Sequence, residues 1–455
     1  MSGALTAYHL NRKAADKRII VVDPRPELGL GLAYSTPSLR HLLNVPAGKI
    51  SALPQEPNHF INWLRKNFDM EATPATFAPR AVFGRYVQSL LASVHGVEQL
   101  RASVIDLHRE GAGARLMFDN GVEVQADYVV LATGNFDPAR LLGIEEAPVE
   151  SGAYCHNAWS AATYANLPQD APMTLIGTGL TGVDVVLRPR ELGHRGTITA
   201  VSRHGIFPNR HATYTPSGRC AIPSETPPTC LAYMRALRGA IAAGVEWRAA
   251  VDSLRATTND LWLVLPLVEQ RRFRRHLQRR WDVVRHRMAA PIANIIEAEL
   301  AARTLVVEEG HLLAVHSEGK GASVSYRAET EVKNILTARV INCTGPSMNY
   351  RRVNSPLLAS LFAQGITTPG PLGGGLGSTR SGALIEARGK ASEFLFNLGP
   401  GRLRTLLESI AIPEIRQQAV EVAAILAERI RRAQPSKATC AVPVNVTASQ
   451  ALIAA

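Results

Sequence analysis

One complete dinucleotide-binding fingerprint, Gly177-Thr178-Gly179-Leu180-Thr181-Gly182, constrains the fold of this 455-residue chain more than any other feature. It follows the apolar run 173–176, precedes a helical stretch at 183–192, and is followed by a strand-like run at 197–201. In a Rossmann unit the first glycine makes a tight turn, the second lets backbone approach a pyrophosphate, and the third lets the helix pack on the strand. The helix N-terminus then presents free N–H groups to the phosphates. This order of elements predicts a nucleotide site rather than an ordinary strand–turn–helix.

The start of the chain repeats the end of this pattern. When the sequence is shifted by 179 positions, Gly3 falls on Gly182 and the strand-like run 18–22 falls on 197–201. Only the last glycine of the fingerprint is present in this copy. We therefore expect an α/β fold with two Rossmann-like dinucleotide-binding domains, in which the FAD-type unit lacks its first strand. We hypothesise that Met1 is an internal methionine of the first fingerprint that was taken as the start.

The residues that end the second strand of each unit predict which nucleotide each unit binds. The second unit has Ser202-Arg203 there, and an arginine accepts the 2′-phosphate that an acid would repel. This favours NADPH and makes NADH the less favoured cofactor; the alternative for Arg203 is a solvated surface charge. The first unit has Asp23, which suits the ribose hydroxyls of FAD. The alternative for Asp23 is a turn residue before Pro24.

Composition and cysteine spacing exclude several classes of function. The formal net charge of +12 suits anionic cofactors and substrates, but no nucleic-acid-binding pattern is found, and the arginine-rich run 271–287 reads as a solvated helix face. The five cysteines form no C-x-x-C pair, which argues against a disulfide reductase and against zinc or iron–sulfur metal sites. There is no signal-peptide core and no long apolar run, so we expect a cytoplasmic protein without a membrane partner.

A repeated strand indicates that one nucleotide domain interrupts the other. The run 128–134 reads as a buried strand that ends in a small-residue turn, and a sister run follows at 340–345, after the second fingerprint. We therefore expect the NADP-type domain to be inserted into the FAD-type domain. The expected parts are 1–168, FAD-binding domain, first part; 169–338, NAD(P)H-binding domain, with a helical insertion at 229–303; 339–433, FAD-binding domain, second part; and 434–455, a disordered tail.

Several motifs resemble a family of bacterial FAD/NAD(P)-binding proteins. That family includes an FAD-dependent urate hydroxylase and a flavin-dependent monooxygenase that oxidises the amino group of aspartate. The resemblance extends over about residues 1–430. The motifs that carry it are Val22 to Gly29, Gly31 to Ser35, His41 to Ala47, Ser51 to Pro54, Pro79-Arg80, Phe83 to Tyr86, Trp281-Asp282 and Arg285 to Met288.

The fingerprint and this resemblance together select candidate cofactor-binding residues. Asn44 and Arg80 are placed near FAD by the resemblance, although Asn44 is equally a turn-forming residue. Val104 meets the adenine through its backbone or packs in the core. Arg285 and His286 meet an anionic substrate or the NADPH phosphate, or lie on a surface helix face. The remaining candidates for FAD are Gly3, Asp23, Gly29, Gly31, Thr133, Gly134, Gly345 and Gly377.

The pairing of FAD with NADPH, without paired redox cysteines, predicts hydride transfer from nicotinamide to flavin. The resemblance implies a monooxygenase that uses molecular oxygen on a small polar substrate. The residues alone leave two alternatives open, a flavin-linked NAD(P)H reductase without oxygen insertion and an inactive nucleotide-binding protein. No catalytic acid or base can be assigned from the sequence.

Overall fold

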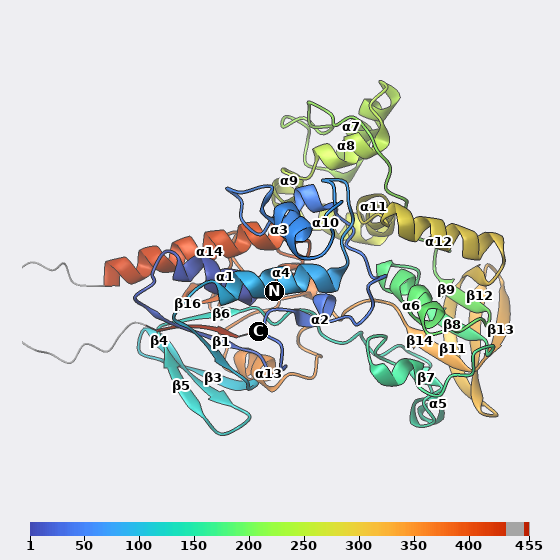
Figure 1. Cartoon of the computed structure of the whole chain (residues 1–455), viewed down its shortest axis with the longest axis horizontal. Coiled ribbons are helices and arrows are strands. Elements are labelled where there is room, and N and C mark those ends of the chain that lie inside the picture. The colour runs from blue at the N-terminus through green and yellow to red at the C-terminus, as the bar shows by residue number, and fades with distance from the viewer. Residues whose placement is uncertain (434–449, 455) are drawn as a thin grey trace, which may run out of the picture. The chain divides into compact units, whose positions relative to one another are not determined.

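The structure, a computed structural model, describes residues 1–433 and 450–454 and divides into two compact units (Figure 1). The first unit comprises residues 1–37, 46–136 and 348–455, and the second comprises 38–45 and 137–347. The chain therefore leaves the first unit, builds the second and returns, so one α/β unit interrupts the other. The boundary expected at 168/169 falls inside the second unit, because residues 154–155 form an edge strand of the second sheet.

The first unit is built on a six-stranded sheet. In spatial order its strands are β15 (Ala383–Ile385), β16 (Ala391–Asn397), β6 (Tyr128–Leu131), β17 (Gln450–Ala454), β1 (Arg18–Val22) and β2 (Val97–Leu100). All neighbouring strands are parallel except β15 and β16. The central strands are runs of aliphatic residues because both faces of a parallel sheet are covered.

Strand β17 differs from what the sequence predicts for residues 434–455. We expect a disordered tail there, together with a first sheet that lacks its first strand. Instead β17 lies between β1 and β6, and the side chain of Ile453 is fully buried. Local sequence does not distinguish a short apolar run in a tail from a buried strand, because only the partner strands decide. Residues 434–449 and 455 lie outside the described part of the chain.

Helices cover one face of this sheet, with α1 (Ser2–Asn11) at the centre (Figure 1). All ten residues of α1 are buried, because it packs on β1 and is covered by α4 (Arg80–Ala92) and α14 (Ile412–Ala433). Helix α14 buries residues at helical spacing, including Ile415, Ala419 and Val422. Two shorter helices of this unit are α2 (Gly31–Tyr34) and α3 (His59–Asn67).

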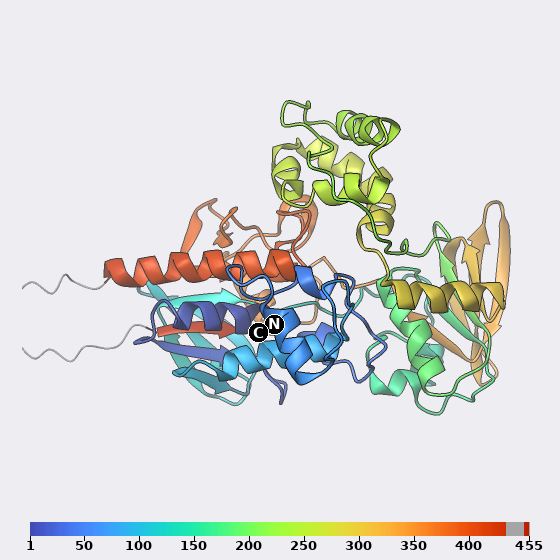
Figure 2. The same ribbon diagram turned by 45° about the horizontal axis from the view of Figure 1, so that its top comes forward.

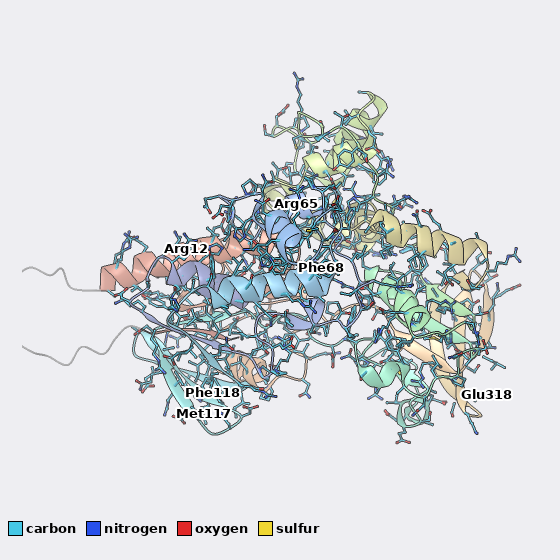
Figure 3. All side chains as sticks on the ribbon, viewed as in Figure 1. Arg12, Arg65, Phe68, Met117, Phe118 and Glu318 are labelled. Carbon is cyan, nitrogen blue, oxygen red and sulfur yellow. The ribbon has the colours of Figure 1, made fainter. Side chains whose placement is uncertain are left out.

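A small antiparallel sheet and one helix cover the other face. They are β3 (Val104–Glu110), β4 (Gly113–Phe118), β5 (Glu123–Ala126) and α13 (Pro356–Ala363). Figure 3 labels Met117 and Phe118 at the end of β4. Phe118 is buried in a hydrophobic cluster with Leu107 and Leu116, and this cluster also contains Ile20 and Leu131 of the main sheet. These contacts form the core of the first unit.

The second unit repeats the arrangement with a five-stranded parallel sheet. In spatial order its strands are β10 (Leu305–Glu309), β9 (Ile198–Ser202), β8 (Met173–Ile176), β14 (Arg339–Asn342) and β7 (Tyr154–Cys155). Helix α6 (Leu180–Glu191) follows β8, and α5 (Glu146–Glu150) precedes β7. An antiparallel sheet packs against the main sheet through a shared apolar cluster; its strands are β11 (His311–Glu318), β12 (Gly321–Ala328) and β13 (Glu331–Thr337).

Helices occupy the stretch in which a helical insertion is expected (Figure 2). They are α7 (Cys230–Ala242), α8 (Trp247–Ser253), α9 (Thr258–Val264), α10 (Leu267–Arg272), a π-helical turn (Phe273–Leu277), α11 (Gln278–Arg285) and α12 (Ala290–Ala301). They have a core of their own, in which Ala250 and Leu254 meet Ile222. Within residues 1–433 and 450–454, no helix combines the length and apolar character that a membrane span requires.

Candidate dinucleotide sites

The three glycines of the fingerprint have three different geometric roles in the turn between β8 and α6. Gly177 has a φ of +117°, and a Cβ there would lie 2.7 Å from the carbonyl oxygen of Cys343. A Cβ at Gly182 would lie 2.6 Å from the carbonyl oxygen of Gly177. A Cβ at Gly179 would meet nothing within 4 Å. Gly177 therefore makes the turn, Gly182 allows the helix to pack on it, and Gly179 leaves open space in front of the helix.

The first turn of α6 presents unused backbone donors beside Gly179. Gly179 is the N-cap residue, and no side chain caps the helix. The N–H of Val183 is the first to bond back along the chain, to the carbonyl of Gly179 at 3.1 Å. Leu180 and Thr181 are only half-buried. A helix start of this kind, with free N–H groups and the positive end of the helix dipole, suits a pyrophosphate.

Ser202 and Arg203, at the end of β9, lie next to this turn. The hydroxyl oxygens of Ser202 and Thr178 are 2.9 Å apart, and Arg203 is exposed. The sequence analysis missed a further residue here, Arg279 of α11. Its Nη2 donates to the carbonyl oxygen of Thr178 at 3.2 Å, to Thr178 Oγ1 at 3.0 Å, and to the carbonyl of Ile206. Arg279 thus joins the helical insertion to the fingerprint turn.

The charges around Arg279 are mixed. Burial lowers the pKa of its guanidinium, Asp282 opposes that shift, and the neighbouring Arg203 adds to it. Two arginine side chains therefore lie close enough to repel each other beside the fingerprint. Like charges placed together are stabilised by an anion between them. This pair of cations is the local feature that favours a phosphate.

The arginine-rich run 271–287 is the solvated helix face that the sequence suggests only in its first part, where Arg271, Arg272, Arg275 and Arg280 are exposed. Arg285 is 6% exposed and Arg287 is 1% exposed, whereas His286 is half-buried. Arg287 forms an ion pair with Asp252, and its guanidinium lies 5.8 Å from the ring centre of Tyr214. Arg285 and Arg287 are buried because they lie at the end of the run, where the helical insertion packs on itself. A run of charges carries no information about such packing.

In the first unit, Asp23 directly follows the last residue of β1, close to where the sequence predicts the strand to end. Its side chain is 1% exposed and accepts hydrogen bonds from Arg25 Nε at 2.9 Å and Nη2 at 2.8 Å. It also accepts one from the backbone N–H of Arg25 at 3.1 Å, which is the bond of a turn-forming aspartate. Asp23 therefore holds the turn after β1, and its place at the strand end is the one from which an acid meets a ribose.

The remaining candidate glycines of the first unit gather at the start of α1. Gly3 is buried within α1. A Cβ at Gly29 would lie 3.2 Å from the Cβ of Ala4, and a Cβ at Gly31 would lie 4.0 Å from the backbone nitrogen of Met1. Gly29 and Gly31 have φ values of +86° and +59°. The loop after β1 therefore folds back against the helix start, where a larger residue at Gly29 would be strained.

The sister turns after β6 and β14 have matching geometry. Gly134 has a φ of +68° and Gly345 a φ of +85°, and a Cβ at either would meet nothing within 4 Å. Thr133, which precedes Gly134, is half-buried. Gly134 lies in the first unit and Gly345 in the second. Gly377, another candidate from the sequence, belongs to the first unit, and a Cβ there would lie 2.5 Å from Thr368 Oγ1.

Three other candidates are placed by packing. Val104 begins β3 opposite Phe118 and packs against the core of the first unit. Arg80 begins α4 and is half-buried. Asn44 belongs to the 38–45 segment of the second unit, where its carbonyl accepts a hydrogen bond from His211 Nε2 at 2.9 Å. The packing role is thus visible for Val104, and the contacts of all three with a cofactor stay predictions.

The structure also reveals polar groups that the sequence analysis did not select, at the carboxyl end of β16. The amide side chain of Asn397 is fully buried, and neither its oxygen nor its nitrogen has a hydrogen-bond partner. Ser378 Oγ and Arg402 Nε are likewise buried without a partner. Burial lowers the pKa of Arg402 to about 10. Buried polar atoms without partners are rare and call for a ligand or water. Ligands of open α/β sheets bind at the carboxyl ends of the strands, which is where Asn397 lies.

The cysteines and the possible metal ligands of the described residues lie as follows. The four cysteines in this part of the chain, Cys155, Cys220, Cys230 and Cys343, are free. Burial raises the pKa of the Cys343 thiol, and burial together with Glu269 raises that of Cys230 to about 11. Among residues 1–433 and 450–454, no cluster of three or more His, Cys, Asp or Glu side chains has the arrangement of a metal site.

The fold and these sites define a protein with two Rossmann-type dinucleotide-binding units. Residues 1–136 match the family model described as FAD-NAD(P)-binding. No curated protein matches the chain in sequence.

Solved structures of flavin enzymes resemble the chain over nearly all of its length. Ornithine hydroxylase from Pseudomonas aeruginosa has a TM-score of 0.62 at 14% identity, and the match covers 94% of this chain and 97% of that one. L-lysine 6-monooxygenase from Pseudomonas syringae has a TM-score of 0.62 at 14% identity, covering 95% and 96%. Ornithine N-hydroxylase from Kutzneria sp. 744, described with reduced FAD, NADP⁺ and ornithine, has a TM-score of 0.60 at 13% identity, covering 91% and 99%. At these identities the likeness establishes the fold.

Proposed function

We propose that this chain is an FAD- and NADPH-dependent oxidoreductase, and specifically a monooxygenase of a small polar substrate that carries an amine. The observation that carries the proposal is the presence of two dinucleotide-type sheets in one chain. The order β2-β1-β17-β6 in the first unit is repeated as β10-β9-β8-β14 in the second. Two such sheets provide sites for two different dinucleotides, which is what electron transfer from a nicotinamide to a flavin needs.

The second unit fits NADPH. Gly179 leaves a cradle that a Cβ would fill, and the free N–H groups of α6 face it. Arg203 and Arg279 supply two cations beside this cradle, where a 2′-phosphate needs them. No acid ends β9, since Ser202 and Arg203 stand there. These residues would bind and orient NADPH and would favour it over NADH.

The first unit fits FAD. Asp23 at the end of β1 and the start of α1 would hold the adenosine and the phosphates. The unpartnered Asn397 and Ser378 side chains offer hydrogen bonds that no protein group uses. The family model match over residues 1–136 supports this assignment. Bound together, the two cofactors supply hydride transfer from nicotinamide to flavin and reaction of the reduced flavin with oxygen.

The substrate class rests on the structural neighbours and on the motif resemblance. The structural neighbours are two ornithine hydroxylases and a lysine monooxygenase. The resembling family includes enzymes that oxidise urate and the amino group of aspartate. All of these substrates are small, polar and nitrogen-containing. A small amine with an anionic group fits this class and the net charge of +12.

The test is substrate-stimulated NADPH oxidation by the purified full-length chain. We expect one FAD per chain, and we expect one small amine or amino acid in a panel to accelerate NADPH oxidation. The oxygen consumed should then appear in an oxidised product. If all the oxygen ends as peroxide with every substrate while artificial acceptors are reduced, the chain is a reductase. If no FAD binds, the two-cofactor assignment is wrong.

A further inference from the structure

Strand β17 occupies the central position of the first sheet, although it comes from the far end of the sequence. On one side Ile19 pairs with Ala451 and Val21 with Ile453. On the other side Tyr128 pairs with Ala451 and Val130 with Ile453. Both pairings are parallel, and Figures 1 and 2 show β17 running beside β1 toward the start of α1. The strand therefore has hydrogen-bonding neighbours on both edges.

The register of β17 is the register of β8 in the second unit. The 179-position shift places Ile19 on Ile198, and Ile198 pairs with Met173 just as Ile19 pairs with Ala451. On the other edge, Arg339 pairs with Met173 just as Tyr128 pairs with Ala451. Two independent edges thus give the same correspondence of 451–454 with 173–176. Residues 173–176 form the strand that leads into the fingerprint turn.

We propose that residues 450–454 form the first strand of the FAD half, so that FAD binding requires this segment of the same chain. This inference rests on the proposed function, because FAD is the ligand. The strand that precedes the turn fixes where the following helix begins. Helix α1 contacts β17, and its Gly3 is the counterpart of Gly182. Without β17, the edges of β1 and β6 lose their partners and the N-terminus of α1 loses its support.

The side chain of Ile453 provides the sharpest substitution. It is 0% exposed, whereas Ile410 of the same unit is 44% exposed. Ile453→Asp places a carboxylate in the buried core against the central strand of the sheet, and burial of an unpaired charge is strongly unfavourable. We expect the FAD content of Ile453→Asp to fall about tenfold or more, and that of Ile410→Asp to stay within about twofold of the wild type. Binding of NADP⁺ to the second unit should persist in both variants.

A cross-link tests the pairing without relying on FAD. Neighbouring strands lie about 4.8 Å apart, within the Cα separation that a disulfide accepts. The double variant Val21→Cys, Ile453→Cys should therefore form a disulfide within one chain upon oxidation. The control Val21→Cys, Ala451→Cys is two positions out of register and should form at most about a tenth as much. A peptide map identifies the linked residues.

The outcomes separate the inference from the proposed function. If the wild type binds no FAD, the proposed function fails, and the cross-link still reports on the strand. If the wild type binds FAD and Ile453→Asp binds it equally well, the inference is overturned. It is also overturned if no Val21–Ile453 disulfide forms, or if the disulfide joins two chains, because then a second copy supplies the strand. An intrachain disulfide together with loss of FAD in Ile453→Asp supports it.

Discussion

Thr178 and Arg279 stand 101 positions apart in the sequence, yet Arg279 Nη2 lies 3.0 Å from Thr178 Oγ1. The same nitrogen also reaches the carbonyl oxygens of Thr178 and Ile206. A single guanidinium therefore links the fingerprint turn, the loop after β9 and the helical insertion.

Replacement of Arg279 should weaken NADPH binding without stopping turnover. For Arg279→Ala we expect the KM for NADPH to rise about tenfold, which corresponds to about 1.4 kcal/mol, while kcat changes little. Arg279→Lys should recover only part of the loss, because lysine keeps the positive charge but cannot pair with a phosphate through two nitrogens at once. Arg275→Ala, an exposed neighbour on the same helical segment, is the matched control. A fall in kcat with an unchanged KM would contradict this role.

Two glycines of the fingerprint should respond differently to alanine. Gly179→Ala should leave the unfolding midpoint unchanged, since a Cβ there meets nothing within 4 Å, but should reduce NADPH affinity about tenfold or more. Gly182→Ala should destabilise the unit by about 2 kcal/mol, since its Cβ would lie 2.6 Å from a carbonyl oxygen. Thermal unfolding and NADP⁺ titration measure the two effects. Equal behaviour of the two variants would be inconsistent with the roles assigned to them.

Asn397 should matter for FAD rather than for the stability of the apoprotein. Its amide has no partner in the protein, so its burial gains nothing until a ligand bonds to it. We expect apo Asn397→Leu to unfold within about 1 kcal/mol of apo wild type, and to bind FAD about tenfold more weakly. Flavin release on dilution measures the FAD affinity, and denaturant unfolding measures the stability of the apoprotein. Unchanged FAD affinity would show that Asn397 does not contact the cofactor.

Thiol modification should be slow and without effect on electron transfer. Burial and Glu269 raise the pKa of Cys230 to about 11, so its reactive thiolate is scarce at neutral pH. The alkylation rate of Cys230 should rise about tenfold per unit between about pH 7 and 9, because the thiolate fraction does. Mass spectrometry follows the modification, and NADPH oxidation should survive it. Rapid alkylation at neutral pH with loss of activity would indicate thiol redox chemistry instead.

The two units differ in how much of each site the sequence predicts. The second site is local, since 177–182 and Ser202-Arg203 lie within one strand–helix–strand unit, and the pattern of glycines specifies its turn. The position of Asp23 directly after β1 was predictable for the same reason, whereas its contact with a cofactor stays a prediction. Arg279 was not, because an arginine in a basic helix carries no signal of a contact 101 positions away.

Non-local pairing also hid strand β17 and part of the proposed FAD site. The run at 451–453 is too short to distinguish from a tail, and only its pairing with β1 and β6 identifies it. Asn397 was missed because it ends an ordinary buried strand, and its lack of hydrogen-bond partners exists only in three dimensions. The inward turn of Arg285 and Arg287 likewise depends on the core of the helical insertion.

The central claim is that one chain binds FAD and accepts electrons from NADPH. The most direct measurement is the rate at which NADPH or NADH reduces the protein-bound flavin in the absence of oxygen. The loss of the flavin's visible absorbance after mixing monitors this reduction. We predict that NADPH reduces the bound FAD at least about tenfold faster than NADH at equal, sub-saturating concentration, because Arg203 and Arg279 favour the 2′-phosphate. A chain that carries no flavin, or whose flavin neither nucleotide reduces, would contradict the account.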